Sequence, residues 1–328
     1  MQRPIRNSRP TRPSATRSAL RRAFSLIELM VVILIITILM GFLLVAVRGA
    51  VIRARVTAVV VEFKNIEKAI TDFKAKYGSE PPSGIVLFEA SAGWGGSSPS
   101  AAAVNRSRAL IRQMWPDFDF TIARDINNDG DFTDIITLNG AECLVFFLGG
   151  MPDQTGVSDT PWALTGFSQN PLNPLALGGA RSGPFYEFDS GRLMNVEGTS
   201  DAEFMPEYRD SLSGQRNPIL YASSYGGRGY RDADVQFTSQ SPYDAYTTTP
   251  TGFAYAYRRY TGSYPATAPN FTASPLFNAK SFQLISPGMD GEYGWGGVLS
   301  GDMELLEPRP ERAFERDNIT NFKGGTIN

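Results

Sequence analysis

An uninterrupted apolar run near the N-terminus limits what this chain can fold into more than any other feature of its sequence. Phe24–Val47 is 24 residues long and contains one charged residue, Glu28, and no proline. As an α-helix it would span about 36 Å, enough to cross the ~30 Å hydrocarbon core of a bilayer. The run therefore predicts a transmembrane helix. Glu28 needs an explanation of its own, because a carboxylate inside hydrocarbon is costly and is by default functional.

The charges on either side of the run predict its orientation. Residues 1–23 contain seven arginines and no acid, whereas three arginines, Arg48, Arg53 and Arg55, follow the run. The positive-inside rule then places the N-terminus in the cytoplasm and the rest of the chain outside it. Without residues 1–23 the chain has 24 basic and 33 acidic residues, a net charge of −9. Such a body does not suit nucleic acid, which requires basic side chains, but it does suit divalent cations.

Two simpler interpretations of the apolar run compete with a functional one. A cleaved secretory signal peptide also has a basic start and an apolar centre, but this run is longer than such a centre and no A-x-A-like site follows it. An ordinary membrane anchor is physically adequate, yet it gives no reason for Glu28.

The helical pattern continues beyond the membrane. Apolar residues recur at spacings of three and four, which is the pattern of one apolar stripe on an α-helix. Gly78 and then Pro81 end the pattern, so we expect an amphipathic stalk helix over residues 48–77. Its partner is either a second helix in a coiled coil or a sheet of the same chain, and the strand-rich remainder favours the sheet. The stripe consists of Ile52, Val56, Val59, Phe63, Ile66, Ile70, Phe73 and Tyr77.

The residues around the start of the apolar run carry a family resemblance. The sequence RRAFSLIEL at residues 21–29 resembles the cleavage and methylation motif of type IV pilins and type II secretion pseudopilins. The resemblance implies that a membrane aspartyl prepilin peptidase cuts between Ala23 and Phe24 and that Phe24 is then N-methylated. It also implies that Glu28 pairs with the N-terminal amine of a neighbouring subunit in a helical filament. The sequence departs from the usual pattern at Ala23, where the family generally has glycine, and in its long basic leader.

This resemblance implies a fold, a location and partners. The fold is an α+β pilin-like one, in which a long N-terminal helix packs on an antiparallel sheet within a loop-rich head over residues 78–328. Residues 1–23 are then a cleaved leader and residues 24–47 the membrane span. The protein sits in the inner membrane with its head in the periplasm before it enters the filament. Its partners are other pilin or pseudopilin subunits, the prepilin peptidase and an inner-membrane assembly platform, and nucleic acid is not among them.

A second resemblance lies near the C-terminus. The sequence FQLISPGMDGEYG at residues 282–294 is similar to the last strand and calcium loop of the major type II secretion pseudopilin. This similarity implies that Asp290 is a Ca²⁺ ligand. A distal acid would complete the site, and the candidate is Asp317, 27 residues further on, with Asp302 and Glu304 as rivals.

A separate acidic segment, DINNDGDFTD at residues 125–134, begins like an EF-hand loop. It has oxygen-bearing side chains at positions 1, 3 and 5 and Gly130 at position 6, but Ile136 replaces the bidentate glutamate of position 12. The pattern predicts a second, weaker Ca²⁺ site, and a solvated turn is the alternative because Asn and Asp favour turns without metal. The candidate ligands are Asp125, Asn127, Asp129, Asp131 and Asp134.

Composition and local patterns describe the rest of the chain. Residues 78–103 read as a Gly/Ser/Pro/Ala-rich loop, and helices are expected over 101–114 and 141–148. Aromatic and β-branched residues between turn residues predict the strands. These strands are 118–123, 184–188, 192–196, 219–223, 253–257 and 281–285.

The residue types that are missing exclude several kinds of chemistry. The chain has no histidine and a single cysteine, Cys143, so it lacks a Ser-His-Asp triad, a histidine-ligated metal and an intrachain disulfide. We expect no catalytic site and no organic cofactor, and the leading hypothesis is a structural subunit of a pilus or type II pseudopilus. The alternatives are a membrane-tethered hydrolase with paired carboxylates or a carbohydrate- or protein-binding module using the tyrosine-rich region 221–264.

Overall fold

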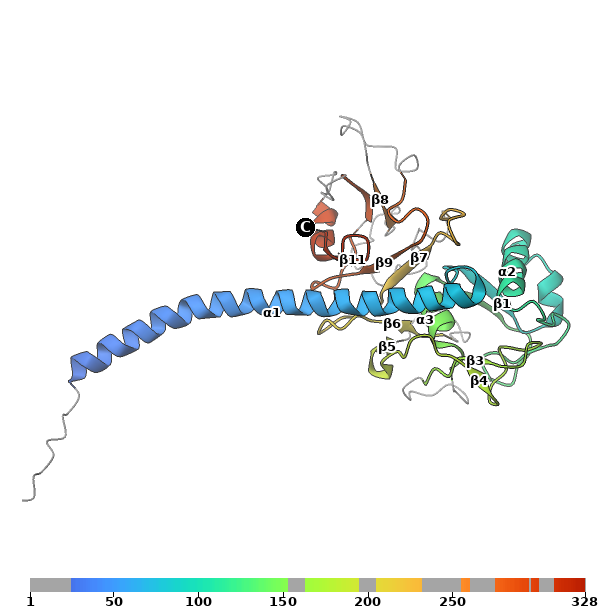
Figure 1. Cartoon of the computed structure of the whole chain (residues 1–328), viewed down its shortest axis with the longest axis horizontal. Helices are drawn as coiled ribbons and strands as arrows, with labels where there is room; N and C mark the ends of the chain where they lie inside the picture. Colours follow the sequence, from blue (N-terminus) through green and yellow to red (C-terminus); the bar gives the residue numbers. More distant parts are fainter. Residues whose placement is uncertain are drawn as a thin grey trace, which may run out of the picture. The chain divides into compact units, whose positions relative to one another are not determined.

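The chain forms two compact units, residues 1–51 and 52–328 (Figure 1). The computed structural model describes residues 25–152, 163–194, 205–231, 255–259, 275–294, 296–300 and 310–327. One α-helix, α1 (Leu26–Tyr77), runs through the end of the first unit and the start of the second.

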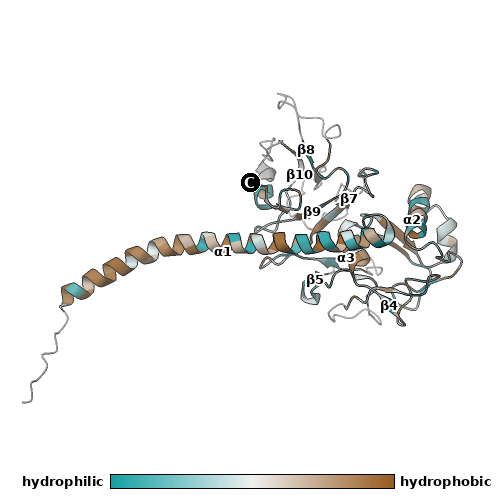
Figure 2. Cartoon of the chain, viewed as in Figure 1, coloured by the Kyte–Doolittle hydropathy of each residue, from teal (hydrophilic) through white to brown (hydrophobic). Residues whose placement is uncertain are grey.

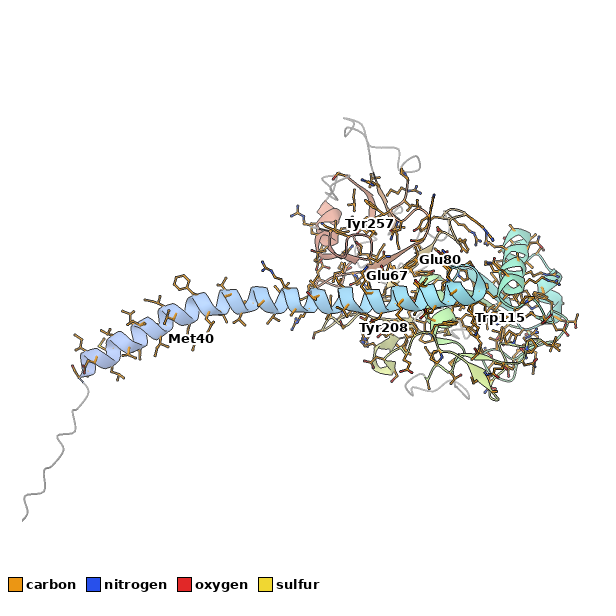
Figure 3. The ribbon with its side chains drawn as sticks, in the orientation of Figure 1. Met40, Glu67, Glu80, Trp115, Tyr208 and Tyr257 are labelled. Carbon is orange, nitrogen blue, oxygen red and sulfur yellow. The ribbon has the colours of Figure 1, made fainter. Side chains whose placement is uncertain are left out.

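In the first unit, α1 is apolar around its whole circumference. Every residue of this part is exposed, and Met40, for example, is 60% exposed (Figures 2 and 3). The hydroxyl of Thr37 donates to the carbonyl oxygens of Ile33 and Leu34 at 2.9 and 2.8 Å, so this polar group is satisfied within the helix. Among the described residues, α1 is the one helix long and apolar enough to cross a membrane. Its exposed surface suits lipid, where every backbone group must also find its partner within the helix.

In the second unit, α1 buries one face in the head. The predicted stripe is buried from Val59 to Tyr77, and the ring of Phe73 makes edge contacts with Phe147 and Phe185 at centroid distances of 5.8 and 5.3 Å. The stripe therefore packs on its own chain, as the strand-rich remainder suggested. The prediction is wrong at Ile52, which is 49% exposed, because the core of the head begins further along the helix.

Two shorter helices were both predicted. Helix α2 (Ala101–Met114) begins at Ser100, whose hydroxyl accepts a hydrogen bond from the Ala103 amide at 3.1 Å. Helix α3 (Gly140–Gly149) begins with a capping box, in which Asn139 and Glu142 each accept from the other's backbone N–H. All but one residue of α3 are buried. The short 3-10 helices are η1 (Ser91–Gly95), η2 (Ser190–Arg192) and η5 (Pro310–Asp317).

A four-stranded antiparallel sheet separates two apolar clusters. Tyr221 and Leu284 face one another across an edge strand and its neighbour and belong to the larger cluster, which includes α1 and α3. Leu220 and Ile285, also paired, point into the smaller cluster on the other face. The strand order is β12 (Gly325–Thr326), β11 (Ile319–Thr320), β9 (Phe282–Ser286) and β7 (Leu220–Ser223).

The smaller cluster is closed by a parallel pair of strands, β8 (Tyr255–Arg259) and β10 (Gly296–Leu299). The buried side chain of Gln283 joins this pair to the sheet. Its Nε2 donates to the Tyr257 carbonyl at 2.8 Å and its Oε1 accepts from the Tyr257 amide at 2.9 Å. One side chain therefore satisfies both backbone groups of a residue in the next layer. These features give an α+β architecture with antiparallel pairing dominant, which confirms the predicted fold class.

Short antiparallel pairs make up the remaining strands: β1 (Ile85–Phe88) with β2 (Ile135–Leu138), β3 (Phe167–Ser168) with β4 (Arg181–Ser182), and β5 (Leu193–Met194) with β6 (Glu207–Tyr208).

The sequence prediction of strands was mixed. Strands over 219–223 and 281–285 are confirmed by β7 and β9, and β5 and β8 cover the described parts of two others. Strands over 118–123 and 184–188 are wrong: in the second of these, Phe185 and Tyr186 both donate their amides to the Leu148 carbonyl at the end of α3. Strand β1 lies in a segment that was predicted as a loop. The sequence did not identify it as a strand because all four of its residues are buried, so apolar and polar residues do not alternate along it.

A largely buried ion pair ties α1 to η2 and β6. Glu62, on α1, accepts from the Arg192 guanidinium at 2.6 Å and from the Tyr208 hydroxyl at 3.0 Å, both through Oε1. Burial raises the pKa of Tyr208, so its hydroxyl keeps the proton that it donates. Glu62 itself is 7% exposed, so its charge depends on Arg192 for compensation.

Removing Arg192 tests this dependence. Arg192→Met should lower the free energy of unfolding by about 1–3 kcal/mol, because a buried acceptor loses its charged donor. Adding Glu62→Gln to that variant should recover part of the loss, since the neutral amide still accepts from Tyr208. Chemical denaturation of the full chain in detergent measures both. Equal stability of the single variant and the wild type would contradict the role given to this pair.

Candidate functional site

The processing and assembly residues lie at the start of α1. Ala23 and Phe24 fall outside the described residues. Glu28 is the third residue of α1, and its Oε2 accepts a hydrogen bond from the Ser25 amide at 2.9 Å. The Leu29 amide donates to the Ser25 carbonyl at 3.2 Å, which makes Ser25 the residue that precedes the helix. Glu28 therefore caps the first turn of its own helix, where a negative charge also complements the helix dipole.

The hydrogen bond from the Ser25 amide uses only part of the acceptor capacity of the Glu28 carboxylate. An ionised carboxylate has two oxygens and about four acceptor positions, and the Ser25 amide occupies one of them. The Glu28 side chain is exposed in the first unit, among apolar side chains. In a lipid environment it still needs a positive partner, and none of the ion pairs of the described residues includes it.

The acidic segment 125–134 forms a turn stabilised by its own side chains. The carboxylate of Asp125 accepts from the amides of Asp129 and Gly130 at 3.2 and 3.0 Å. Gly130 has a φ of +89°, a conformation that the glycine at position 6 supplies without strain. The Asn127 amide nitrogen lies between two carboxylates and donates to Asp129 at 3.0 Å and to Asp134 at 2.9 Å.

A buried glutamate that the sequence analysis missed anchors this segment. Glu89, fully buried after β1, accepts from the Ile126 amide at 2.6 Å and from the Asp134 amide at 3.3 Å. Burial raises the pKa of Glu89, and burial together with the nearby Asp129 and Asp131 raises the pKa of Asp134. Negative charge therefore collects at this turn. Glu89 lies 36 residues before the turn, so no local sequence pattern connects the two.

The structure brings Asp290 and Asp317 together, as the sequence analysis proposed. The Asp317 carboxylate accepts from the amides of Met289 and Asp290 at 2.5 and 3.0 Å. Asp290 in turn accepts from the Glu292 amide at 2.9 Å. Burial raises the pKa of Asp317. The rival acids Asp302 and Glu304 lie outside the described residues.

Neither acidic loop is a complete metal site by its side chains alone. Within the described residues, no group of three or more His, Cys, Asp or Glu side chains is placed to hold a metal ion. The calcium predictions for both loops thus remain predictions, and any cation would need carbonyl, amide or water oxygens in addition.

The tyrosine-rich region, in its described part, packs inside the head. Tyr221, Tyr225 and Tyr257 are buried, and the Tyr230 hydroxyl donates to the carbonyls of Phe277 and Asn278. Tyr243, Tyr246, Tyr260 and Tyr264 lie outside the described residues. Tyr221, Tyr225, Tyr230 and Tyr257 thus belong to the two apolar clusters.

Comparison with known proteins bears on the N-terminal segment. The family model of the prokaryotic N-terminal methylation motif matches residues 19–44. The match covers Ala23, Phe24 and Glu28 together with most of the apolar run. No curated protein and no solved structure matches the chain.

Proposed function

We propose that this chain, which carries the N-terminal methylation motif of the type IV pilin and pseudopilin family, is a structural subunit of a type II secretion pseudopilus. Prepilin peptidase removes residues 1–23, and the mature protein resides in the inner membrane with its head in the periplasm. An assembly platform then moves it from the membrane into a helical filament with other pilin-like subunits. The observation that carries this proposal is the single carboxylate of Glu28 at the start of the apolar, exposed first part of α1.

The chemistry of the first turn supports assembly through Glu28. Cleavage before Phe24 creates a new amine, and N-methylation keeps it basic. Phe24 precedes Glu28 by four residues, about one helical turn or 6 Å along the axis. When a neighbouring helix is displaced by about one turn, its amine reaches the depth of the Glu28 carboxylate, and the two charges neutralise one another inside an apolar bundle.

A pseudopilus is preferred to a type IV pilus because of the C-terminal segment. The similarity of residues 282–294 to the last strand and loop of the major pseudopilin coincides with a real structural unit, since β9 ends in that loop and β11 pairs with β9. A type IV or minor pilin is the next candidate, because the N-terminal motif is common to both groups.

We also propose that the turn at 125–134 binds Ca²⁺. Its polar side chains are those of four aspartates, two asparagines and one threonine, all of which carry oxygen, and oxygen ligands suit a hard cation. Within the described residues none of the salt bridges involves its four aspartates. The Asn127 amide nitrogen sits between the Asp129 and Asp134 carboxylates, where positive charge is favoured. Rotation of that amide would present its oxygen to a cation held by the same carboxylates.

Processing gives the first prediction for this function. In cells with an active prepilin peptidase, the mature chain should begin with N-methylated Phe24, as measured by N-terminal mass spectrometry of purified membranes. Ala23→Gly restores the residue usual in the family and should be processed at least as fast. A chain that keeps Met1 under these conditions would argue decisively against a pilin-like subunit.

The second prediction concerns assembly. Glu28→Ala should insert and be processed normally, yet filament yield after overexpression should fall sharply, since losing one partner of a buried charge pair costs about 3–5 kcal/mol. Thr37→Val is the matched control, because it removes the other polar side chain of the same helix segment, whose hydroxyl bonds only within the helix. Normal filaments from Glu28→Ala, or equal loss from both variants, would rule out the proposed pairing.

The third prediction concerns calcium. Binding to the folded state alone raises its stability by about 2.7 kcal/mol when the ion is in 100-fold excess over the dissociation constant. The full chain in detergent should therefore melt several degrees higher in calcium than in chelator. Asp125→Asn combined with Asp129→Asn should abolish this difference, and Asp117→Asn, which changes an exposed aspartate outside the turn, should leave it intact. No calcium effect on the wild-type chain would refute the proposal.

A further inference from the structure

The loop after β9, residues 287–292, is the one that resembles a calcium loop, and two of its carbonyl groups have side-chain partners. The Gln215 side-chain amide donates to the Gly288 carbonyl at 3.1 Å. The Asn217 side-chain amide donates to the Gly291 carbonyl at 2.6 Å. Backbone carbonyls are ligands that Ca²⁺ takes in such loops, and here each of these two faces an N–H group instead. The donor set consequently does not fit a cation at this place.

The side chain of Gln215 is held in position by the buried carboxylate of Asp210. Its amide nitrogen also donates to the carboxylate of Asp210 at 3.0 Å, and the same carboxylate oxygen accepts from the Ser286 hydroxyl at the end of β9. Asp210 is 2% exposed, and burial raises its pKa. Its other oxygen accepts from the Leu212 amide at 2.8 Å. The segment between β6 and β7 thus contributes a buried polar network that contacts the loop through Gln215 and the end of β9 through Asp210.

The C-terminal segment holds the same loop from the other side. The Asp317 carboxylate binds the amides of Met289 and Asp290. Gly288 has a φ of +72°, and a Cβ there would lie 2.4 Å from the Asp317 carbonyl oxygen, so the two segments are in direct backbone contact. One residue further on, the side-chain amide nitrogen of Asn318 donates to the Tyr293 carbonyl at 2.8 Å. The loop is therefore fixed between two segments of the same chain.

We propose that the amides of Gln215 and Asn217, with Asp210 orienting the first of them, hold this loop in place of a divalent cation. An amide N–H presents positive charge to a carbonyl oxygen as a cation does, and two such groups reach two carbonyls three residues apart. Asp317 completes the arrangement as an acceptor of backbone N–H groups and not as a metal ligand. The head then keeps its C-terminal segment attached to β9 whether calcium is present or absent.

A calcium titration in a suitable background tests this inference without any filament. The full chain in detergent carries Asp125→Asn and Asp129→Asn, so that the turn at 125–134 does not contribute. Its melting temperature should be the same in calcium and in chelator. A rise of several degrees in calcium that Asp290→Asn abolishes would overturn the inference and would restore the cation at this loop.

Variants of the amides provide the second arm. In the same background, Gln215→Ala and Asn217→Ala should each lower the melting temperature by several degrees, by equal amounts in calcium and in chelator. Gln169→Ala is the matched control, because its amide also donates to a carbonyl, that of Arg181 at 2.9 Å, but is exposed. A loss no greater than that of the control would overturn the role of the amides. If either variant does not fold, Gln215→Glu serves instead, because it keeps the size of the side chain but exchanges the N–H group for oxygen. It should lower the melting temperature by the same amount in calcium and in chelator. A melting temperature restored by calcium would count against the inference.

Discussion

The packing of one apolar stripe of α1 is the constraint on which the head depends. From Val59 to Tyr77 this stripe is buried, and its aromatic rings meet Phe147 of α3 and Phe185 of the segment that follows β4. Burial of a large apolar side chain stabilises the folded state by about 1.5–3 kcal/mol, so this stripe is a large part of the core. Between Leu29 and Val47 the same helix is apolar on all sides except at Thr37, and each of these residues is exposed. One helix thus serves two environments, and the change from an all-round to a one-sided apolar pattern marks the boundary.

The regular elements of the head account for only part of its hydrogen bonding. Most strands are two to five residues long, so many backbone N–H groups lie in irregular segments without a ladder partner. Carboxylates accept hydrogen bonds from some of these groups: Glu89 binds the amides of Ile126 and Asp134, Asp210 that of Leu212, and Asp317 those of Met289 and Asp290. Unsatisfied buried amides would be costly. Part of the acidic excess of the body thus has a structural explanation that needs no nucleic acid, substrate or metal.

The sequence predicted those elements whose identifying residues are neighbours along the chain, and it missed those that depend on distant residues. The long helix, α2 and α3 were predicted correctly, because their apolar periodicity, caps and glycine ends are contained within about a dozen neighbouring residues. Strand β1 was missed because burial on both faces removes the alternation that identifies a strand. The aromatic segments 118–123 and 184–188 were mistaken for strands, since their rings pack on helices from irregular backbone. Glu28 could be singled out from sequence alone because an acid in an apolar run is conspicuous by itself. Glu62 and Glu89 could not, because each finds its partners across more than 35 residues of sequence. Asp210 could not, because Ser286, which links it to β9, lies 76 residues away.

The two acidic loops show why a loop sequence by itself does not settle what holds the loop. Both have aspartate and glycine in an order that suits calcium, and both fold into turns with glycine at positive φ. They differ in what surrounds them. At 125–134 the neighbours are further carboxylates, and an amide nitrogen lies between two of them, so a positive charge would relieve repulsion. At 287–292 two neighbours are amide side chains directed at neutral carbonyls. Their N–H groups already supply the partial positive charge that these carbonyl oxygens would otherwise find in a cation. The deciding residues, Gln215 and Asn217, lie about 70 residues before the loop, and a motif confined to the loop does not contain them.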